Sequence, residues 1–276
     1  MELGLNGATT LKADLATDIA VAGTAGFDFV EIWAAKLMGY LDNGGLPALK
    51  RDLKRSGVRA VTLNSVERVT FNDPSGHIRM LEDFQRFCRV AEAIGAETVI
   101  VVPSPRPKGV SLKAIEQESV KVLRQLSKIA QPYDLKLAYE FLGFADCTVN
   151  SLAQCAAIVQ EVARENVGLV LDTFHFFAGG STVASIGKVD PRKIFIVHVN
   201  DVERAPRSKM HDALRLFPGK GIIPLAQILG ALRSIGYTGK FSVEIFRPQY
   251  WNRPPLEVAR EARRTALAAL RQAGFC

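Results

Sequence analysis

Eight short apolar runs recur along the chain, and patterns typical of helices separate them. The runs span residues 3–7, 27–33, 58–64, 97–103, 135–143, 167–172, 193–201 and 240–246. They are rich in Val, Ile, Leu and Phe without strict alternation, which is typical of parallel strands that are buried on both faces. Strands that alternate with helices through right-handed crossovers predict a closed (β/α)8 TIM barrel.

The segments between the runs show apolar residues at three- and four-residue spacing, which predicts amphipathic helices. Helices are expected at residues 77–97, 111–133, 151–163 and 255–274. Ser111 and Asn150 stand where N-caps are expected, and Gly95 stands where a helix would stop. These signals place a helix after each of several strands, as the barrel requires.

The chain length suits one large domain. Its 276 residues match the about 250 residues of a typical barrel of this class. Apolar residues make up 48% of the chain, which is enough for a sizeable core, and no linker or low-complexity tract interrupts it. We therefore expect a single domain over residues 1–276. An open doubly wound sheet is the alternative, and the absence of GxGxxG after the first run counts against it.

The chain is basic, with a formal net charge of +7 and a pI near 9.3. The excess charge is spread out, and its densest patches lie at residues 50–59 and 204–209. No recognised nucleic-acid-binding motif accompanies them, so no nucleic-acid partner is expected.

The chain shows no targeting or membrane signal. No apolar run approaches the roughly 20 residues that span a bilayer, and no basic segment followed by a long apolar one opens the sequence. Four scattered cysteines without a CxxC pair indicate free thiols. These features predict a cytoplasmic protein that does not bind membranes.

Ionisable residues stand at or near the carboxyl ends of the last four expected strands: Glu140, Asp172, His198 and Glu244. In a barrel, neighbouring strands converge on one mouth, where barrel enzymes carry their sites. Burying three carboxylates and an imidazole together costs several kcal/mol unless a cation offsets their charge. The pattern therefore predicts one divalent metal ion, and it leaves Mn, Zn, Co and Mg open.

Each of these residues also has an ordinary structural interpretation. A single Glu or Asp at a strand end commonly caps a loop or forms a salt bridge, and a His in an apolar strand is commonly a hydrogen-bonded core residue. Four consecutive strands that end in this way favour the metal site over coincidence.

Other polar and aromatic residues near strand ends are weaker candidates. Glu31 and Trp33, near the end of the second run, are expected to wall a substrate pocket, with a structural role as the alternative. Asn6 and Asn64 end the first and third runs, where they could simply cap loops.

Two residues of the long connection that follows the seventh run also allow two interpretations. Asp212 could serve the mouth of the barrel, but a surface loop is the expected position. Arg204, six residues after His198, could reach a substrate oxygen or lie exposed.

The chain resembles the xylose-isomerase-like barrel superfamily, and within it the inosose isomerase group. The resemblance covers nearly the whole chain and rests on "NGATTLKADL", "AQPYDLKLAYEFLGFADCTVNS", "NVGLVLDTFHF", "KIFIVHVND", "FPGKGII" and "SVEIFRPQYW". It implies that the four strand-end residues bind one divalent metal and that Glu140 and Glu244 act as an acid/base pair. It also implies that His175 and Arg204 hold substrate oxygens, because related epimerases use residues at these spacings.

The resemblance implies an isomerase or epimerase that acts on a small polyol or keto-sugar by proton transfer through an enediolate. Inosose (2-keto-myo-inositol) is the expected substrate. A lyase such as 3-dehydroshikimate dehydratase, a ketose 3-epimerase and a non-enzymatic sugar-binding barrel remain alternatives. Endonuclease-four-type relatives need extra histidines after the second to fourth strands, and Asn64 and residues 103–107 supply none. Assembly into a homo-oligomer is left open.

Overall fold

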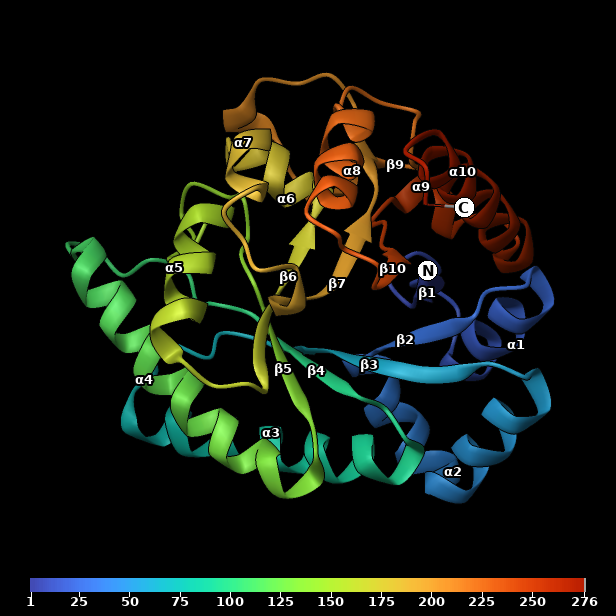
Figure 1. Ribbon diagram of the computed structural model, residues 1–276. Helices are drawn as coiled ribbons and strands as arrows, with labels where there is room; N and C mark the ends of the chain where they lie inside the picture. The colour runs from blue at the N-terminus through green and yellow to red at the C-terminus, as the bar shows by residue number, and fades with distance from the viewer. Residues whose placement is uncertain (276) are drawn as a thin grey trace.

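Eight parallel strands close into a barrel in the computed structural model, which describes residues 1–275 (Figure 1). The barrel strands are β1 (Glu2–Asn6), β2 (Phe29–Trp33), β3 (Arg59–Val66), β4 (Thr98–Val101), β5 (Lys136–Glu140), β6 (Val167–Asp172), β7 (Ile194–Val199) and β10 (Lys240–Val243). They follow one another around the barrel in chain order, and β10 pairs with β1 to close it. The predicted (β/α)8 barrel is confirmed.

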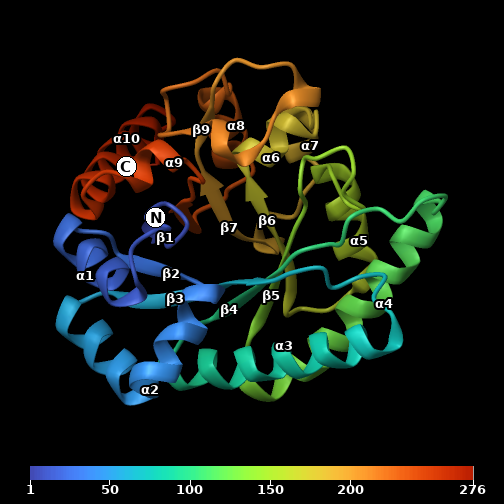
Figure 2. The same cartoon turned by 180° about the vertical axis from the view of Figure 1, so that it is seen from behind.

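Helices surround the strands, and Figures 1 and 2 show this ring from opposite sides. The long helices are α1 (Leu15–Ala25), α2 (Ala34–Ser56), α3 (Pro74–Ile94), α4 (Leu112–Ala130), α5 (Leu152–Val162), α8 (Leu225–Ser234) and α10 (Pro255–Gln272). Ser111 caps α4 and Gly95 ends α3 in the left-handed conformation, as the sequence predicts. Ser151, rather than the predicted Asn150, caps α5 through its hydroxyl.

Short elements lie in the connections that follow the strands. They are α6 (Thr173–Ala178), α7 (Val183–Ile186), α9 (Pro248–Trp251) and the 3-10 turns η1 (Gln131–Tyr133), η2 (Pro191–Lys193), η3 (Arg207–Lys209) and η4 (Asp212–Leu214). Two two-residue strands, β8 (Asp201–Val202) and β9 (Arg215–Leu216), pair antiparallel after β7. This small sheet was not expected from the sequence, and it turns the long connection back over the barrel mouth.

Two layers of apolar packing hold the barrel together. A cluster drawn mainly from successive strands, including Phe29, Val61, Ile100 and Ile196, fills the barrel interior. A larger cluster joins the outer faces of the strands to the buried faces of the helices.

Replacing Gly4 by alanine is expected to lower the free energy of unfolding by about 1–3 kcal/mol, as overpacking of a core does. A Cβ atom at Gly4 would lie 2.1 Å from Cε2 of Phe29, whose ring is fully buried. Gly230 in α8 is the matched control, because a Cβ atom there meets nothing within 4 Å. Gly230→Ala should leave stability unchanged or raise it by about 0.5–1 kcal/mol. Urea unfolding measures both, and equal stability of the two variants would contradict this packing.

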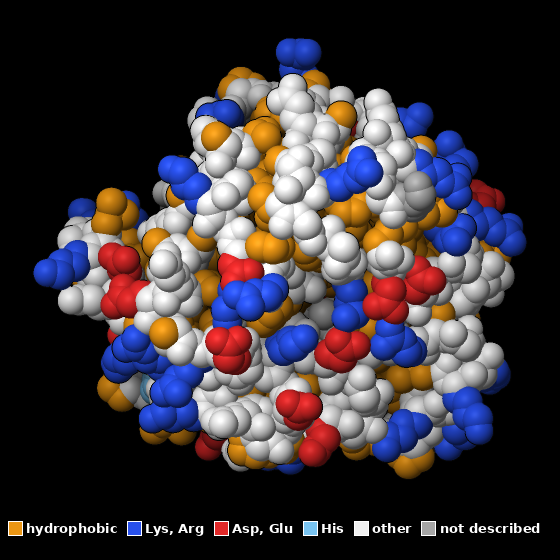
Figure 3. Space-filling view, in the orientation of Figure 1, with side chains coloured by type: hydrophobic (Ala, Val, Ile, Leu, Met, Phe, Trp, Pro, Cys, Tyr) orange, Lys and Arg blue, Asp and Glu red, His pale blue; other side chains and the backbone are white. Residues whose placement is uncertain are grey.

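The charged side chains are spread over the face of the molecule that Figure 3 shows, as the sequence predicts. Figure 3 shows basic side chains scattered among acidic ones on one face of the molecule. Within residues 1–275, no helix is long and apolar enough to cross a membrane. Cys88, Cys147 and Cys155 carry free, buried thiols, and Cys276 lies outside the described residues.

Candidate metal centre and pocket

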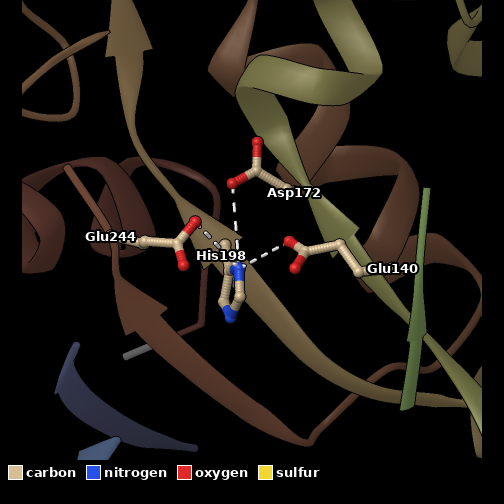
Figure 4. Close-up of side chains that lie close together, drawn as sticks. All are labelled: Glu140, Asp172, His198 and Glu244. Atoms are coloured by element: carbon tan, nitrogen blue, oxygen red, sulfur yellow. Dashed lines mark hydrogen bonds and ion pairs between the residues drawn. The ribbon is translucent and has the colours of Figure 1, made fainter. Parts of the chain in front are cut away.

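The four residues predicted from the strand ends converge at the barrel mouth (Figure 4). Glu140 and Asp172 end β5 and β6, His198 lies in β7, and Glu244 directly follows β10. All four are buried, and one ligand atom of each lies within 4.8 Å of the others. The Nδ1 atom of His198 lies 2.9 Å from Oε1 of Glu140, 3.3 Å from Oε2 of Glu244 and 3.8 Å from Oδ2 of Asp172.

The pKa values of Glu140 and His198 are both raised, because the cluster gathers several buried carboxylates. Burial and the neighbouring carboxylates of Glu244 and Asp172 raise the pKa of Glu140 to about 8, although His198 opposes this shift. Burial lowers the pKa of His198, but Glu244, Glu31 and Glu140 outweigh it and raise that pKa well above its usual value. Three carboxylate oxygens and one imidazole nitrogen form a donor set that suits a divalent cation. The cluster therefore fits one divalent metal ion.

Glu31 fixes the orientation of the His198 ring from below. Its Oε1 atom lies 3.1 Å from Nε2 of His198, and the side chain is fully buried. An Nε2–H group that donates to Glu31 leaves the Nδ1 lone pair facing the three carboxylates, as in many metal-bound histidines. The structure thus places Glu31 beneath the cluster and not along the substrate cavity, where the sequence had predicted it.

A cavity of about 350 Å³ opens above the cluster. Trp33, Phe144 and Phe246 line part of it, and Trp33 packs edge-to-face on Phe246 with ring centroids 5.3 Å apart. Glu140 and Glu244 contribute to its polar side. Trp33 is therefore where the sequence had predicted it, at the wall of the pocket. The cavity joins apolar walls to a small set of convergent polar groups, which is the usual character of a small-molecule site.

The helix that follows β6 brings His175 back to the cavity. Asp172 caps α6, and its Oδ1 accepts from the backbone N–H of His175 at 2.8 Å. The His175 ring lines the cavity, and its Nδ1 accepts from the backbone N–H of Gly143 at 3.1 Å. Burial, more than the attraction of Asp172 can offset, lowers the pKa of His175 to about 4. The imidazole is therefore neutral at physiological pH.

Arg215 also lies at the site, and the sequence analysis did not identify it. Its Nη1 donates to Oδ2 of Asp172 at 2.7 Å and to Oε2 of Glu244 at 3.1 Å, and its Nη2 lies 3.0 Å from Nε2 of His175. Its Nε donates to Oδ1 of Asp212 at 2.9 Å. The guanidinium is buried and lines the cavity.

The β8–β9 pairing explains why Arg215, and not Arg204, reaches the site. Val202 stands opposite Arg215 in this sheet, which returns the chain to the barrel mouth. Arg204 is exposed in the intervening loop and is not part of the cavity wall. Asp212, expected on a surface loop, also lines the cavity. The one sequence signal for Arg215 is its position two residues before "FPGKGII", a segment that carries the family resemblance.

Comparison with known proteins places this site in a family. A family model described as "Xylose isomerase-like TIM barrel" matches residues 19–271. The chain is 37% identical over 269 residues to the inosose isomerases of Bacillus licheniformis and Bacillus subtilis, covering 97% of this chain and 97% of each relative. It is 29% identical over 248 residues to a 3-dehydroshikimate dehydratase of Pseudomonas aeruginosa, covering 86% of this chain and 37% of that protein.

Solved structures agree with these relatives. The crystal structure of the IOLI protein with a bound zinc atom superposes with a TM-score of 0.97 at 36% identity, and all of both chains is covered. D-psicose 3-epimerase from Clostridium cellulolyticum H10 has a TM-score of 0.80 at 22% identity over all of both chains, a likeness of fold alone. The resemblance seen in the sequence is confirmed, and the chain belongs to the xylose isomerase-like TIM barrel family.

Proposed function

We propose that this protein is a divalent-metal-dependent inosose isomerase, which moves the carbonyl group of an inosose to a neighbouring ring carbon. The observation that carries the proposal is the buried cluster of Glu140, Asp172, His198 and Glu244 at the floor of the cavity. The full-length identity to two Bacillus inosose isomerases supports the substrate.

The four cluster residues would hold the metal through one carboxylate oxygen each and through Nδ1 of His198. When bound, the metal supplies Lewis-acid polarisation of a substrate carbonyl and its neighbouring hydroxyl. This polarisation acidifies the C–H bond of the carbon that bears the hydroxyl. The protein then has to move one proton between two adjacent carbons.

Glu140 and Glu244 would move that proton, because both line the cavity and belong to the cluster. One carboxylate removes the hydrogen of the hydroxyl-bearing carbon, which gives an enediolate. The other group delivers a proton to the former carbonyl carbon, and a proton passes between the two oxygens, so that the product is an isomer of the substrate.

Arg215 and His175 would stabilise the oxygen that becomes negative in the enediolate. The Arg215 guanidinium is a permanent cation at the cavity wall, and His175 is a neutral imidazole beside it. Preorganised donors of this kind act strongly in a buried site. The aromatic surfaces of Trp33 and Phe246 would contact the C–H faces of the ring.

A dehydratase is the second candidate, because the relative from Pseudomonas aeruginosa matches 86% of this chain. It would form a similar enolate and then expel a hydroxyl group as water. Incubating the zinc-loaded protein with inosose and with 3-dehydroshikimate, and reading products by NMR and mass spectrometry, separates the two. Isomerisation of inosose at constant mass is expected. A dehydrated product from 3-dehydroshikimate, with inosose unchanged, would show that the protein is a dehydratase and not an inosose isomerase.

A cytoplasmic location and a small-molecule partner complete the proposal. Both rest on the sequence features and on the character of the cavity. The absence of nucleic-acid binding and the assembly into a homo-oligomer remain predictions.

A further inference from the structure

Strands β1, β2 and β3 lie between β10 and β4 in the barrel and contribute none of the four cluster residues. They carry a second set of buried polar side chains. These are Asn6 at the end of β1, Glu31 in β2 and Asn64 in β3. The exposed fractions of the two asparagines are 0% and 2%. A buried amide costs free energy unless its hydrogen-bonding groups are paired, so their partners indicate what they do.

Both asparagines donate to the same oxygen of Glu244. Nδ2 of Asn6 lies 3.0 Å and Nδ2 of Asn64 lies 2.9 Å from Oε1 of Glu244. The orientation of the Asn6 amide is fixed independently, because its Oδ1 accepts from the backbone N–H of Ala8 at 2.8 Å. Its NH2 group must therefore face Glu244.

Asn64 links Glu244 to Glu31, the residue that orients the His198 ring. Its Nδ2 also donates to Oε1 of Glu31 at 2.9 Å, and that same oxygen faces Nε2 of His198 at 3.1 Å. One amide thus holds two carboxylates, one in the cluster and one beneath it. The side of the barrel opposite β5 and β6 supports the cluster through hydrogen bonds.

The two amides determine which oxygen of Glu244 faces the cluster. With Oε1 occupied by two donors, Oε2 is the atom near Nδ1 of His198, at 3.3 Å, and near Nη1 of Arg215, at 3.1 Å. Glu140 differs, because within residues 1–275 its side chain has only His198 as a hydrogen-bond partner. Hydrogen bonds to both carboxylate oxygens therefore restrain Glu244 more than Glu140.

We propose that Asn6 and Asn64 are positioning residues that preorganise Glu244 as a metal ligand and so set the affinity of the site for its metal. This inference rests on the metal site proposed above. Partners that orient a ligand typically change metal affinity by about 10–100-fold when they are removed. Asn6 provides the cleaner test, since it is fully buried, is absent from the cavity wall and acts on the cluster through Glu244.

The test measures the zinc affinity of the metal-free protein by competition with a chromophoric chelator. Asn6→Leu and Asn64→Leu, which keep a branched side chain but remove the donors, should each raise the zinc Kd by about 10-fold, and the double variant by about 100-fold. If a leucine variant does not fold, Asn6→Ala or Asn64→Ala removes the same donor without added bulk.

Asn166→Leu is the matched control. Asn166 is an asparagine at the opposite end of the barrel, where it donates to the carbonyls of Ser127 and Leu135 at 3.2 Å each. Its loss should lower the melting temperature and leave the zinc Kd unchanged. Unchanged zinc affinity in the Asn6 and Asn64 variants, or an equal loss in Asn166→Leu, would overturn the inference while the metal site stands. Failure of the wild-type protein to bind zinc would overturn the proposed function with it.

Discussion

Arg215→Met should remove most of the activity and destabilise the metal-free protein by about 3–5 kcal/mol, the cost of leaving buried charges without their partner. Arg215 pairs with Asp172 and Glu244 in the buried cluster, and no other arginine or lysine among the described residues forms an ion pair with either. Urea unfolding with and without zinc measures this. Zinc adds positive charge to the same cluster, so the loss should be smaller in the loaded protein.

Arg204→Met is the control for this prediction. The sequence predicts that Arg204 holds a substrate oxygen, whereas the structure has Arg215 at the cavity. Arg204 is exposed, so its replacement should change stability by less than about 0.5 kcal/mol and leave turnover unchanged. If Arg204→Met abolished turnover and Arg215→Met did not, Arg204 would be the arginine that holds a substrate oxygen, as its spacing from His198 predicts. This result would also contradict the position of the β8–β9 sheet at the barrel mouth.

Glu140→Gln should lower kcat by about 10²–10⁴-fold, the typical contribution of a general acid or base. The amide keeps an oxygen that can face the metal but cannot exchange a proton at neutral pH. Zinc content per chain must be measured beside kcat, so that a loss of metal is not mistaken for a loss of proton transfer.

Glu67→Gln is the matched control for this change. Glu67 also lines the cavity, but it is exposed and lies outside the cluster. We expect its kcat to stay within a few-fold of the wild-type value. Wild-type turnover in zinc-loaded Glu140→Gln would remove the acid/base role from Glu140.

The barrel and the four clustered residues could be predicted because their signals are local. Each strand is a short apolar run, and each cluster residue stands at or next to the end of such a run. Parallel strands bring these ends to one rim, so a linear pattern becomes a site.

Glu31 shows where a strand pattern stops being informative. Glu31 and Trp33 are two residues apart in β2, which places their side chains on the same face of the strand. They differ in depth by about 7 Å along the strand, so one lies under the cluster and the other at the cavity wall. The alternation of side chains along a strand shows which face a residue occupies. It does not show whether the residue lies in the packed interior or at the cavity above it.

Arg215 and the two asparagines show what depends on tertiary contacts. Arg215 reaches the cluster through a pairing of two-residue strands, which is too short to leave a pattern in the sequence. Asn6 fits the expected loop-capping role, since its Oδ1 accepts from Ala8, but its amide also binds Glu244. Only the fold shows that one side chain does both.

The residues of this cluster are proposed to transfer a proton next to the carbonyl of an inosose. The most direct test incubates zinc-loaded protein with inosose in D₂O and follows the ring carbons by NMR. The predicted result is an isomer that carries deuterium at the carbon next to the carbonyl, formed faster than without protein and lost after the zinc is removed. Neither deuterium nor an isomer, with one zinc bound per chain, would contradict this proposal.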